Sequence, residues 1–169
     1  KKMARRSQKS DPQTLCTALV DKLQVFPKAL KGTLQEQVKL LVPAHYLLRD
    51  LGSSLMPADS SARDRILSYL KTNVSQVVHG DELMVISGIS EYARRARELR
   101  VEHGWQIITG NTIRDIRDDE ESAEDLKSLP SLKPDEYMLL SAKQDKDAAS
   151  RWKVAKEIRN EKMGVRDKI

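Results

Sequence analysis

The side chains best suited to chemistry in this 169-residue chain are three closely spaced arginines, Arg94, Arg95 and Arg97. A guanidinium group donates two parallel hydrogen bonds to the O6 and N7 atoms of guanine, and it pairs in a similar way with a phosphate. The cluster therefore suits contacts with a nucleic acid. A second interpretation stays open, because Glu98 follows Arg94 by four residues, a spacing that stabilises any solvent-exposed helix. Glu91 and Arg95 repeat that spacing.

The net charge of +5 adds little support for such a partner. Residues 1–10 contain five basic side chains and no acid, so the rest of the chain sums to zero. Only local clustering of basic side chains can therefore favour nucleic-acid binding. Residues 1–11 are predicted to form a disordered basic tail.

The sequence contains no recognisable arrangement for catalysis, for a metal ion or for a cofactor. Its histidines, His45, His79 and His103, are dispersed, and the single Cys16 leaves no zinc-site spacing. Neither a Walker-type phosphate loop nor a G-x-G-x-x-G motif is present. No apolar run is long enough to span a membrane, and one cysteine favours a reducing cytoplasm as the location.

The elements that would position the arginines follow an N-terminal helical subdomain, which we predict over residues 12–58. Apolar residues recur at helical spacing over residues 15–27 and again over residues 34–43. Because proline interrupts helices, Pro43 should end the second helix, and a third short helix is predicted over residues 44–51.

A different pattern follows over residues 59–143. Its order is helix, strand, helix, tight turn, helix, strand, strand, which is the order of a winged helix-turn-helix domain. Between the last two strands the acidic insert 111–131 is longer than the fold requires, and we expect it to be mobile. The predicted elements are a helix from Ala62, an extended stretch over residues 74–78, helices over residues 80–88 and 90–103, and strands over residues 105–109 and 137–140.

Residues 90–103 would be the recognition helix, which lies in the major groove of duplex DNA. We expect Arg94 and Arg95 to contact bases and Arg97, nearer the flank, to contact a phosphate. Tyr92 suits either the core or a phosphate contact. The predicted core face consists of Ile89, Ala93, Ala96 and Leu99, and the predicted DNA-binding residues are Arg63, His79, Ser90, Glu91, Tyr92, Arg94, Arg95 and Arg97.

Two further segments complete the expected organisation. Residues 144–164 are predicted to form a charged linker helix. Residues 165–169 have the same character as residues 62–66, which indicates either the start of a second repeat or a chance likeness. The expected fold class is mainly α with a small β wing: an N-terminal helical subdomain, a winged helix-turn-helix and a C-terminal charged helix.

The stretch 92–107 carries a family resemblance, with Arg97-Glu98-Leu99-Arg100 followed by Gly104-Trp105. It resembles the winged-helix modules that precede the nuclease domain in bacterial HNH-type restriction endonucleases. The resemblance covers residues 62–141, where residues 132–139 would be the turn into the last strand, although the acidic insert is longer than in that pattern. It implies recognition of double-stranded DNA, with cutting by a downstream nuclease domain, because the HNH residues are absent from this chain.

Two other functions remain open. A transcriptional regulator would use the N-terminal helices to dimerise two winged helices on a palindrome. A protein-interaction module is consistent with the near-zero charge outside the tail. The expected partners are double-stranded DNA, a second copy of the chain in a homodimer, and the downstream nuclease domain.

Overall fold

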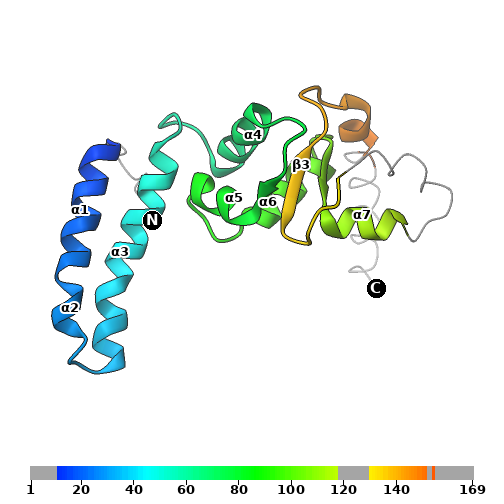
Figure 1. Cartoon of the computed structure of the whole chain (residues 1–169). Helices are drawn as coiled ribbons and strands as arrows, with labels where there is room; N and C mark the ends of the chain where they lie inside the picture. Colours follow the sequence, from blue (N-terminus) through cyan, green and yellow to red (C-terminus); the bar gives the residue numbers. More distant parts are fainter. Residues whose placement is uncertain (1–10, 118–129, 152–153, 155–169) are drawn as a thin grey trace, which may run out of the picture.

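The computed structural model describes residues 11–117, 130–151 and 154, and its architecture is mainly α-helical with one small sheet (Figure 1). The expected fold class, mainly α with a small β sheet, is confirmed. The tail before Asp11, residues 118–129 of the insert, most of the charged helix and the repeat at 165–169 lie outside the described residues. None of the helices in the described part is long and apolar enough to cross a membrane.

The N-terminal part is a helical hairpin in which α1 and α3 pack side by side (Figure 1). Asp11 caps α1 by accepting hydrogen bonds from the backbone N–H groups of Gln13 and Thr14, and Pro12 occupies the first turn. The elements are α1 (Pro12–Gln24), the one-turn α2 (Phe26–Ala29) and α3 (Leu34–Ser54).

The predicted helix end at Pro43 is wrong. α3 continues through Pro43 to Ser54, so two predicted helices are one. A proline inside a helix removes one backbone hydrogen bond, but packing of an amphipathic face supplies most of a helix's stability. Here α3 packs along α1, buries Ala44 and begins with a capping box between Thr33 and Glu36.

The remaining elements follow the expected order with one addition. The antiparallel sheet has the order β1-β3-β2, with His79 opposite Glu136 and Thr109 opposite Tyr137. The additional helix, α7, occupies the first part of the predicted insert, and residues 146–151 form a helical turn that begins the predicted charged helix. The bounds are α4 (Ala62–Thr72), β1 (Val78–His79), α5 (Gly80–Ser87), α6 (Tyr92–Val101), β2 (Ile107–Thr109), α7 (Gly110–Arg117) and β3 (Glu136–Leu139).

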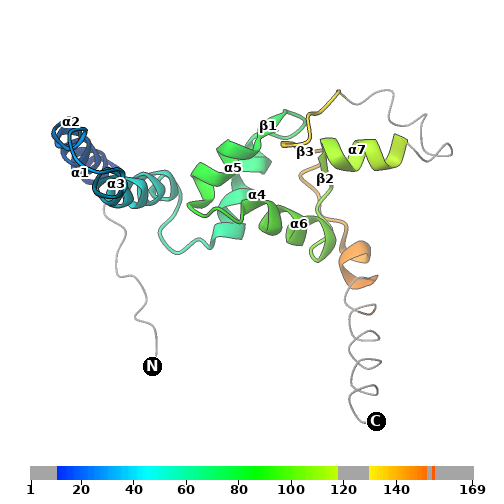
Figure 2. The same ribbon diagram turned by 90° about the horizontal axis from the view of Figure 1, so that it is seen from below.

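The core of this second part lies between α4, α5, α6 and one face of the sheet. Because successive side chains of a strand point to opposite faces, Ile107 joins this core while Ile108 lies on the other face. There Ile108 packs with Ile113 of α7 and Met138. Figure 2 shows α7 on the other side of the strands from α5. The main cluster comprises Ile66, Leu70, Val78, Leu83, Ala96, Leu99, Trp105, Ile107, Tyr137 and Leu139.

Two glycines join α3 closely to the α5–α6 turn. A Cβ atom at Gly52 would lie 2.4 Å from the carbonyl oxygen of Val85, so only glycine allows this approach. Gly88 ends α5 with a left-handed φ of 67°, and Arg49 Nε donates to its carbonyl at 2.9 Å. These contacts attach the hairpin to the turn that leads into α6.

Candidate nucleic-acid interface

The solvent-exposed face of α6 is basic. Its exposed positions, together with the preceding turn, are Ser90, Glu91, Ala93, Arg94 and Arg97, and those within the helix itself are Ala93 and the two arginines. The prediction that Ala93 faces the core is wrong, because a spacing of three residues drifts by about 60° per step around a helix of 3.6 residues per turn. The inward positions are instead Tyr92, Ala96 and Leu99, at i, i+4 and i+7.

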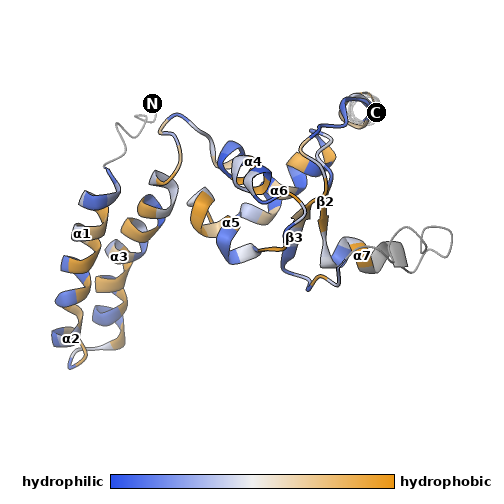
Figure 3. Ribbon diagram, turned by 45° about the horizontal axis from the view of Figure 1, so that its top comes forward, coloured by the Kyte–Doolittle hydropathy of each residue, from blue (hydrophilic) through white to orange (hydrophobic). Residues whose placement is uncertain are grey.

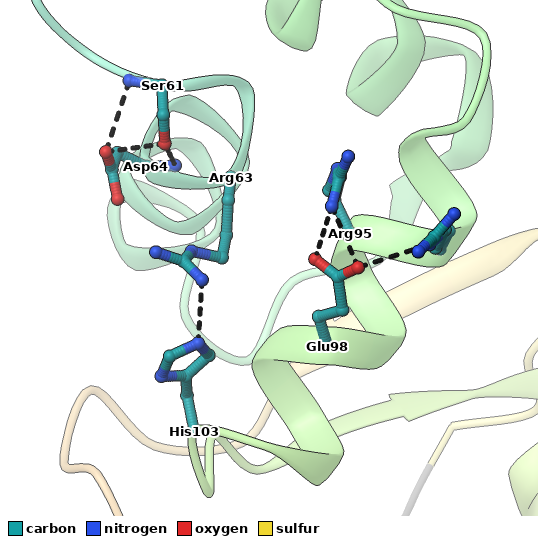
Figure 4. Close-up of polar contacts among 7 residues, drawn as sticks. Ser61, Arg63, Asp64, Arg95, Glu98 and His103 are labelled. Carbon is teal, nitrogen blue, oxygen red and sulfur yellow. Dashed lines mark hydrogen bonds and ion pairs between the residues drawn. The ribbon is translucent and has the colours of Figure 1, made fainter.

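Arg94 and Arg95, the expected base contacts, both pair with Glu98. Figure 4 shows the contact between Arg95 and Glu98. Arg94 Nε lies 3.2 Å from Glu98 Oε1, and Arg95 Nη1 donates to both carboxylate oxygens at 2.8 and 2.7 Å. The hydrogen bond from Arg95 lowers the pKa of Glu98, so the carboxylate stays ionised. The Arg94 side chain is nevertheless 74% exposed, against 37% for Arg95, so Arg94 is the freer of the two to meet a ligand.

Arg97 makes no hydrogen bond or ion pair with any residue that the structure describes. It lines a pocket of about 200 Å³ between α6, β2 and the start of α7, together with Arg100. Thr109, Asn111 and Thr112 add hydroxyl and amide groups to the lining, and Arg100 donates to the Thr112 hydroxyl. Two guanidinium groups among neutral polar side chains form an arrangement suited to an oxyanion such as a phosphate.

The other predicted residues lie away from this face. Arg63 of α4 donates from Nη1 to Nε2 of His103 at 2.8 Å, beyond the end of α6 (Figure 4). Because arginine has no acceptor, this contact requires an unprotonated Nε2 on His103. His79 caps α5: its Nδ1 accepts from the backbone N–H of Asp81, and its Nε2 lies 2.7 Å from the carboxylate of Asp135.

Tyr92 and Glu91 occupy the start of α6. The half-buried Tyr92 ring packs edge to face against Tyr137, with the ring centroids 6.2 Å apart, which places it at the core. Glu91 is exposed and precedes the first helical residue without capping it through its side chain.

Arg65, which the sequence analysis did not single out, helps to position α6. It is buried in α4 and donates to the backbone carbonyls of Ser60, Ile86 and Ser87. Burial lowers the pKa of its guanidinium, which remains charged because arginine ionises so strongly. Arg65 thus ties α4 to the end of α5, just before the turn into α6. No local signal distinguishes it from Arg63, because two of its three partners, Ile86 and Ser87, are more than twenty residues away.

Comparison with known protein families relates the second part of the chain to restriction endonucleases. Residues 63–140 match the family described as KpnI N-terminal domain. The match extends from α4 to β3, so it includes α6, the Arg97 pocket and Arg65, and it leaves the N-terminal hairpin outside. Comparisons with curated proteins and with solved structures give no significant match.

Proposed function

We propose that this chain binds duplex DNA and recognises a sequence in it, as the specificity module of a restriction-type endonuclease. The observation that carries the proposal is Arg97, which lies beside Arg100 in a pocket along α6 and has no hydrogen-bond or ion-pair partner among the described residues. The match to the KpnI N-terminal domain supports it. So does the order of α4, β1, α5, α6, β2 and β3, which we interpret as a winged helix-turn-helix with α6 as the recognition helix. A downstream HNH nuclease domain and a cytoplasmic location belong to the same proposal.

The geometry of α6 assigns different tasks to its arginines. Ala93 is small and exposed, so the helix backbone can come close to the floor of a groove. Arg94 extends from the same face and suits a guanine edge, whereas Arg97 and Arg100 hold a backbone phosphate in the pocket. Base contacts supply specificity and phosphate contacts supply affinity. Loss of Arg94 should therefore change the sequence preference, and loss of Arg97 should change the overall affinity.

Separate substitution of Arg97 and Arg94 by alanine tests this division. Selection from a randomised duplex pool at two salt concentrations gives the sequence preference, and titrations give the affinity. Arg97→Ala should weaken binding to all duplexes by about tenfold and reduce the salt slope by about one. Arg94→Ala should relax the preference at one base-pair position, by roughly 5- to 150-fold in discrimination.

Lys28→Ala is the matched control, because it removes one positive charge on the hairpin, away from α6. It should change neither affinity nor preference. Absence of both an enriched motif and salt-dependent binding in the unsubstituted chain would overturn the DNA proposal and favour a protein-interaction module.

Glu98→Gln should strengthen DNA binding. The carboxylate competes with phosphates for Arg94 and Arg95, so its neutralisation frees both guanidinium groups. We expect about three- to tenfold tighter binding at low salt and a steeper salt dependence. Glu102→Gln, at the end of α6, removes one negative charge as Glu98→Gln does, and it should leave the affinity for DNA nearly unchanged. Weaker binding by Glu98→Gln would mean that Glu98 positions the arginines instead of competing for them.

A further inference from the structure

The pocket beside α6 contains a tyrosine hydroxyl that no described residue satisfies. Tyr137 of β3 lines this pocket with Arg97 and Arg100, and only 8% of its surface is exposed. Its hydroxyl makes no hydrogen bond with any residue that the structure describes. All fully enclosed polar side-chain atoms of the described residues have a partner, so this hydroxyl is reached from outside, and Tyr137 lines the pocket. Because a tyrosine hydroxyl at this depth normally has a hydrogen-bond partner, it points to a ligand that enters the pocket.

The hydroxyl of Tyr137 is a donor at neutral pH. Burial raises the pKa of Tyr137, and the positive charge of Arg100 opposes part of that rise. The hydroxyl therefore keeps its proton and can give it to an acceptor atom of a ligand. The effect of Arg100 on this pKa also means that its guanidinium group lies near the hydroxyl, on the same pocket.

The rest of the lining is also rich in donors and positive charge. Among the described residues that line the pocket there is no carboxylate. Arg97 has no hydrogen-bond or ion-pair partner there, and Arg100 donates to the Thr112 hydroxyl. The Thr112 hydroxyl lies 2.9 Å from that of Thr109, so the group that holds Arg100 is itself held in place. Two positive charges without a nearby carboxylate favour an anionic ligand with several acceptor atoms.

The three donor side chains lie at different depths. Arg97 is exposed, Arg100 is half-buried and Tyr137 is buried. The apolar part of the lining includes Ala96 of α6 and Ile107 of β2, a strand that Figure 3 colours as hydrophobic. An anion that fills the pocket would therefore meet guanidinium groups nearer the mouth and the tyrosine hydroxyl at the floor.

The number and depth of these donors fit one form of phosphate better than another. An internal phosphate of a DNA strand is a diester with two free oxygens, and the arginines nearer the mouth are sufficient to bind it. A phosphate monoester has three free oxygens and a charge of about −1.5 to −2 at pH 7. Its single ester bond also allows it to enter a pocket end-on. Three donor side chains, two of them charged, therefore match a monoester.

We propose that the pocket is a phosphomonoester site, in which Arg97, Arg100 and the hydroxyl of Tyr137 together bind the terminal phosphate of a DNA strand. The inference rests on the proposed function, because it takes DNA as the source of the phosphate. Hydrolysis of one phosphodiester bond leaves a hydroxyl on one new end and a phosphate monoester on the other. A module with this pocket would therefore bind cut DNA, the product of a restriction-type cleavage, as well as intact duplex.

The test compares binding of the full 169-residue chain to short duplexes of one sequence that carry a 5′-phosphate, a 3′-phosphate or hydroxyl ends alone. At least one phosphorylated duplex should bind about thirtyfold more tightly than the hydroxyl-ended duplex, because charge-assisted hydrogen bonds are the strong ones. Tyr137→Phe changes no charge and should reduce this preference about tenfold, the contribution of one hydrogen bond to a charged group. The 5′ and 3′ duplexes show which strand end enters the pocket.

Tyr69→Phe is the matched control. It removes the hydroxyl of a tyrosine on α4, which donates to Glu82 and does not line the pocket. This variant should keep the full preference for phosphorylated ends, and circular dichroism checks that both variants remain helical. Equal binding of phosphorylated and hydroxyl ends, or a preference that Tyr137→Phe leaves intact, would overturn the inference and leave the proposed DNA binding standing.

Inorganic phosphate tests the site without DNA. At about ten times its dissociation constant it should raise the unfolding temperature of the chain by roughly 3–6 °C, compared with sodium chloride at equal ionic strength. Tyr137→Phe should lose most of this rise, whereas Tyr69→Phe should keep it. If this result were obtained and no duplex bound, the proposed function would fail, and the DNA end would be overturned as the source in favour of a free phosphate compound.

Discussion

Replacement of Arg65 by methionine should lower the free energy of unfolding by about 3 kcal/mol. Methionine keeps much of the aliphatic volume of arginine, so the loss of stability reports mainly the loss of the guanidinium group. Without it, the carbonyls of Ser60, Ile86 and Ser87 lose a donor in a mostly buried environment, where each unsatisfied acceptor costs about 1–3 kcal/mol. Urea unfolding followed by circular dichroism measures the effect.

Arg63→Met is the matched control, because it lies two positions away on the same helix. Arg63 is half-buried and contacts one group, His103, so we expect a loss below about 1 kcal/mol. Arg65→Lys should resemble Arg65→Met, since an ammonium group cannot serve carbonyls in the directions of the guanidinium fork. If Arg63→Met and Arg65→Met lowered the free energy of unfolding equally, Arg65 would not be the residue that holds α4 to the α5–α6 turn.

Gly104→Ala should destabilise the chain by roughly 2–4 kcal/mol, through two separate effects. Gly104 has a left-handed φ of 66°, which a side chain adopts at a cost. A Cβ atom there would also lie 2.0 Å from the carbonyl oxygen of Asp145, which forces the segment after β3 to move. Thermal or urea unfolding of the two proteins measures the difference.

Two further variants separate these effects. Gly32→Ala is the comparison, because its φ is not left-handed and its Cβ atom would lie 2.7 Å from Glu36 Oε2, the capping atom of α3, which is the end of a side chain and can shift. We therefore expect a smaller loss of stability than in Gly104→Ala. Asparagine tolerates the left-handed conformation, so Gly104→Asn keeps mainly the clash with Asp145. If Gly104→Asn were as stable as the unsubstituted chain, the destabilisation by Gly104→Ala would come from backbone conformation alone. That result would contradict the close packing against Asp145.

Features that depend on neighbours in the chain were predictable from the sequence. Asp11 and Pro12 start α1, and Gly88 ends α5, because caps and left-handed turns involve only a few adjacent residues. The same holds for the two later strands and for the order of elements around α6. Composition and periodicity were enough to predict a mainly helical chain with a small sheet.

Features that depend on distant partners were not predictable. Pro43 stays inside α3 because α1 supports the helix, and Ala93 faces solvent because the fold selects Tyr92, Ala96 and Leu99 as the inward positions. Within α6, sequence spacing allowed Arg95 to pair with Glu91, whereas rotamers in the structure bring it to Glu98.

The composition of the candidate site shows the same division. The sequence by itself determined that α6 is an arginine-rich helix preceded by a glycine turn, because these properties are local. Tertiary structure alone decided that Arg97 lies beside Arg100 without a hydrogen-bond or ion-pair partner among the described residues. It also decided that Arg65 is buried against three carbonyls and that large apolar side chains of the hairpin stay exposed. The physical reason is that pairing, burial and exposure depend on which distant segments fold against a residue, and periodicity along one helix does not contain that information.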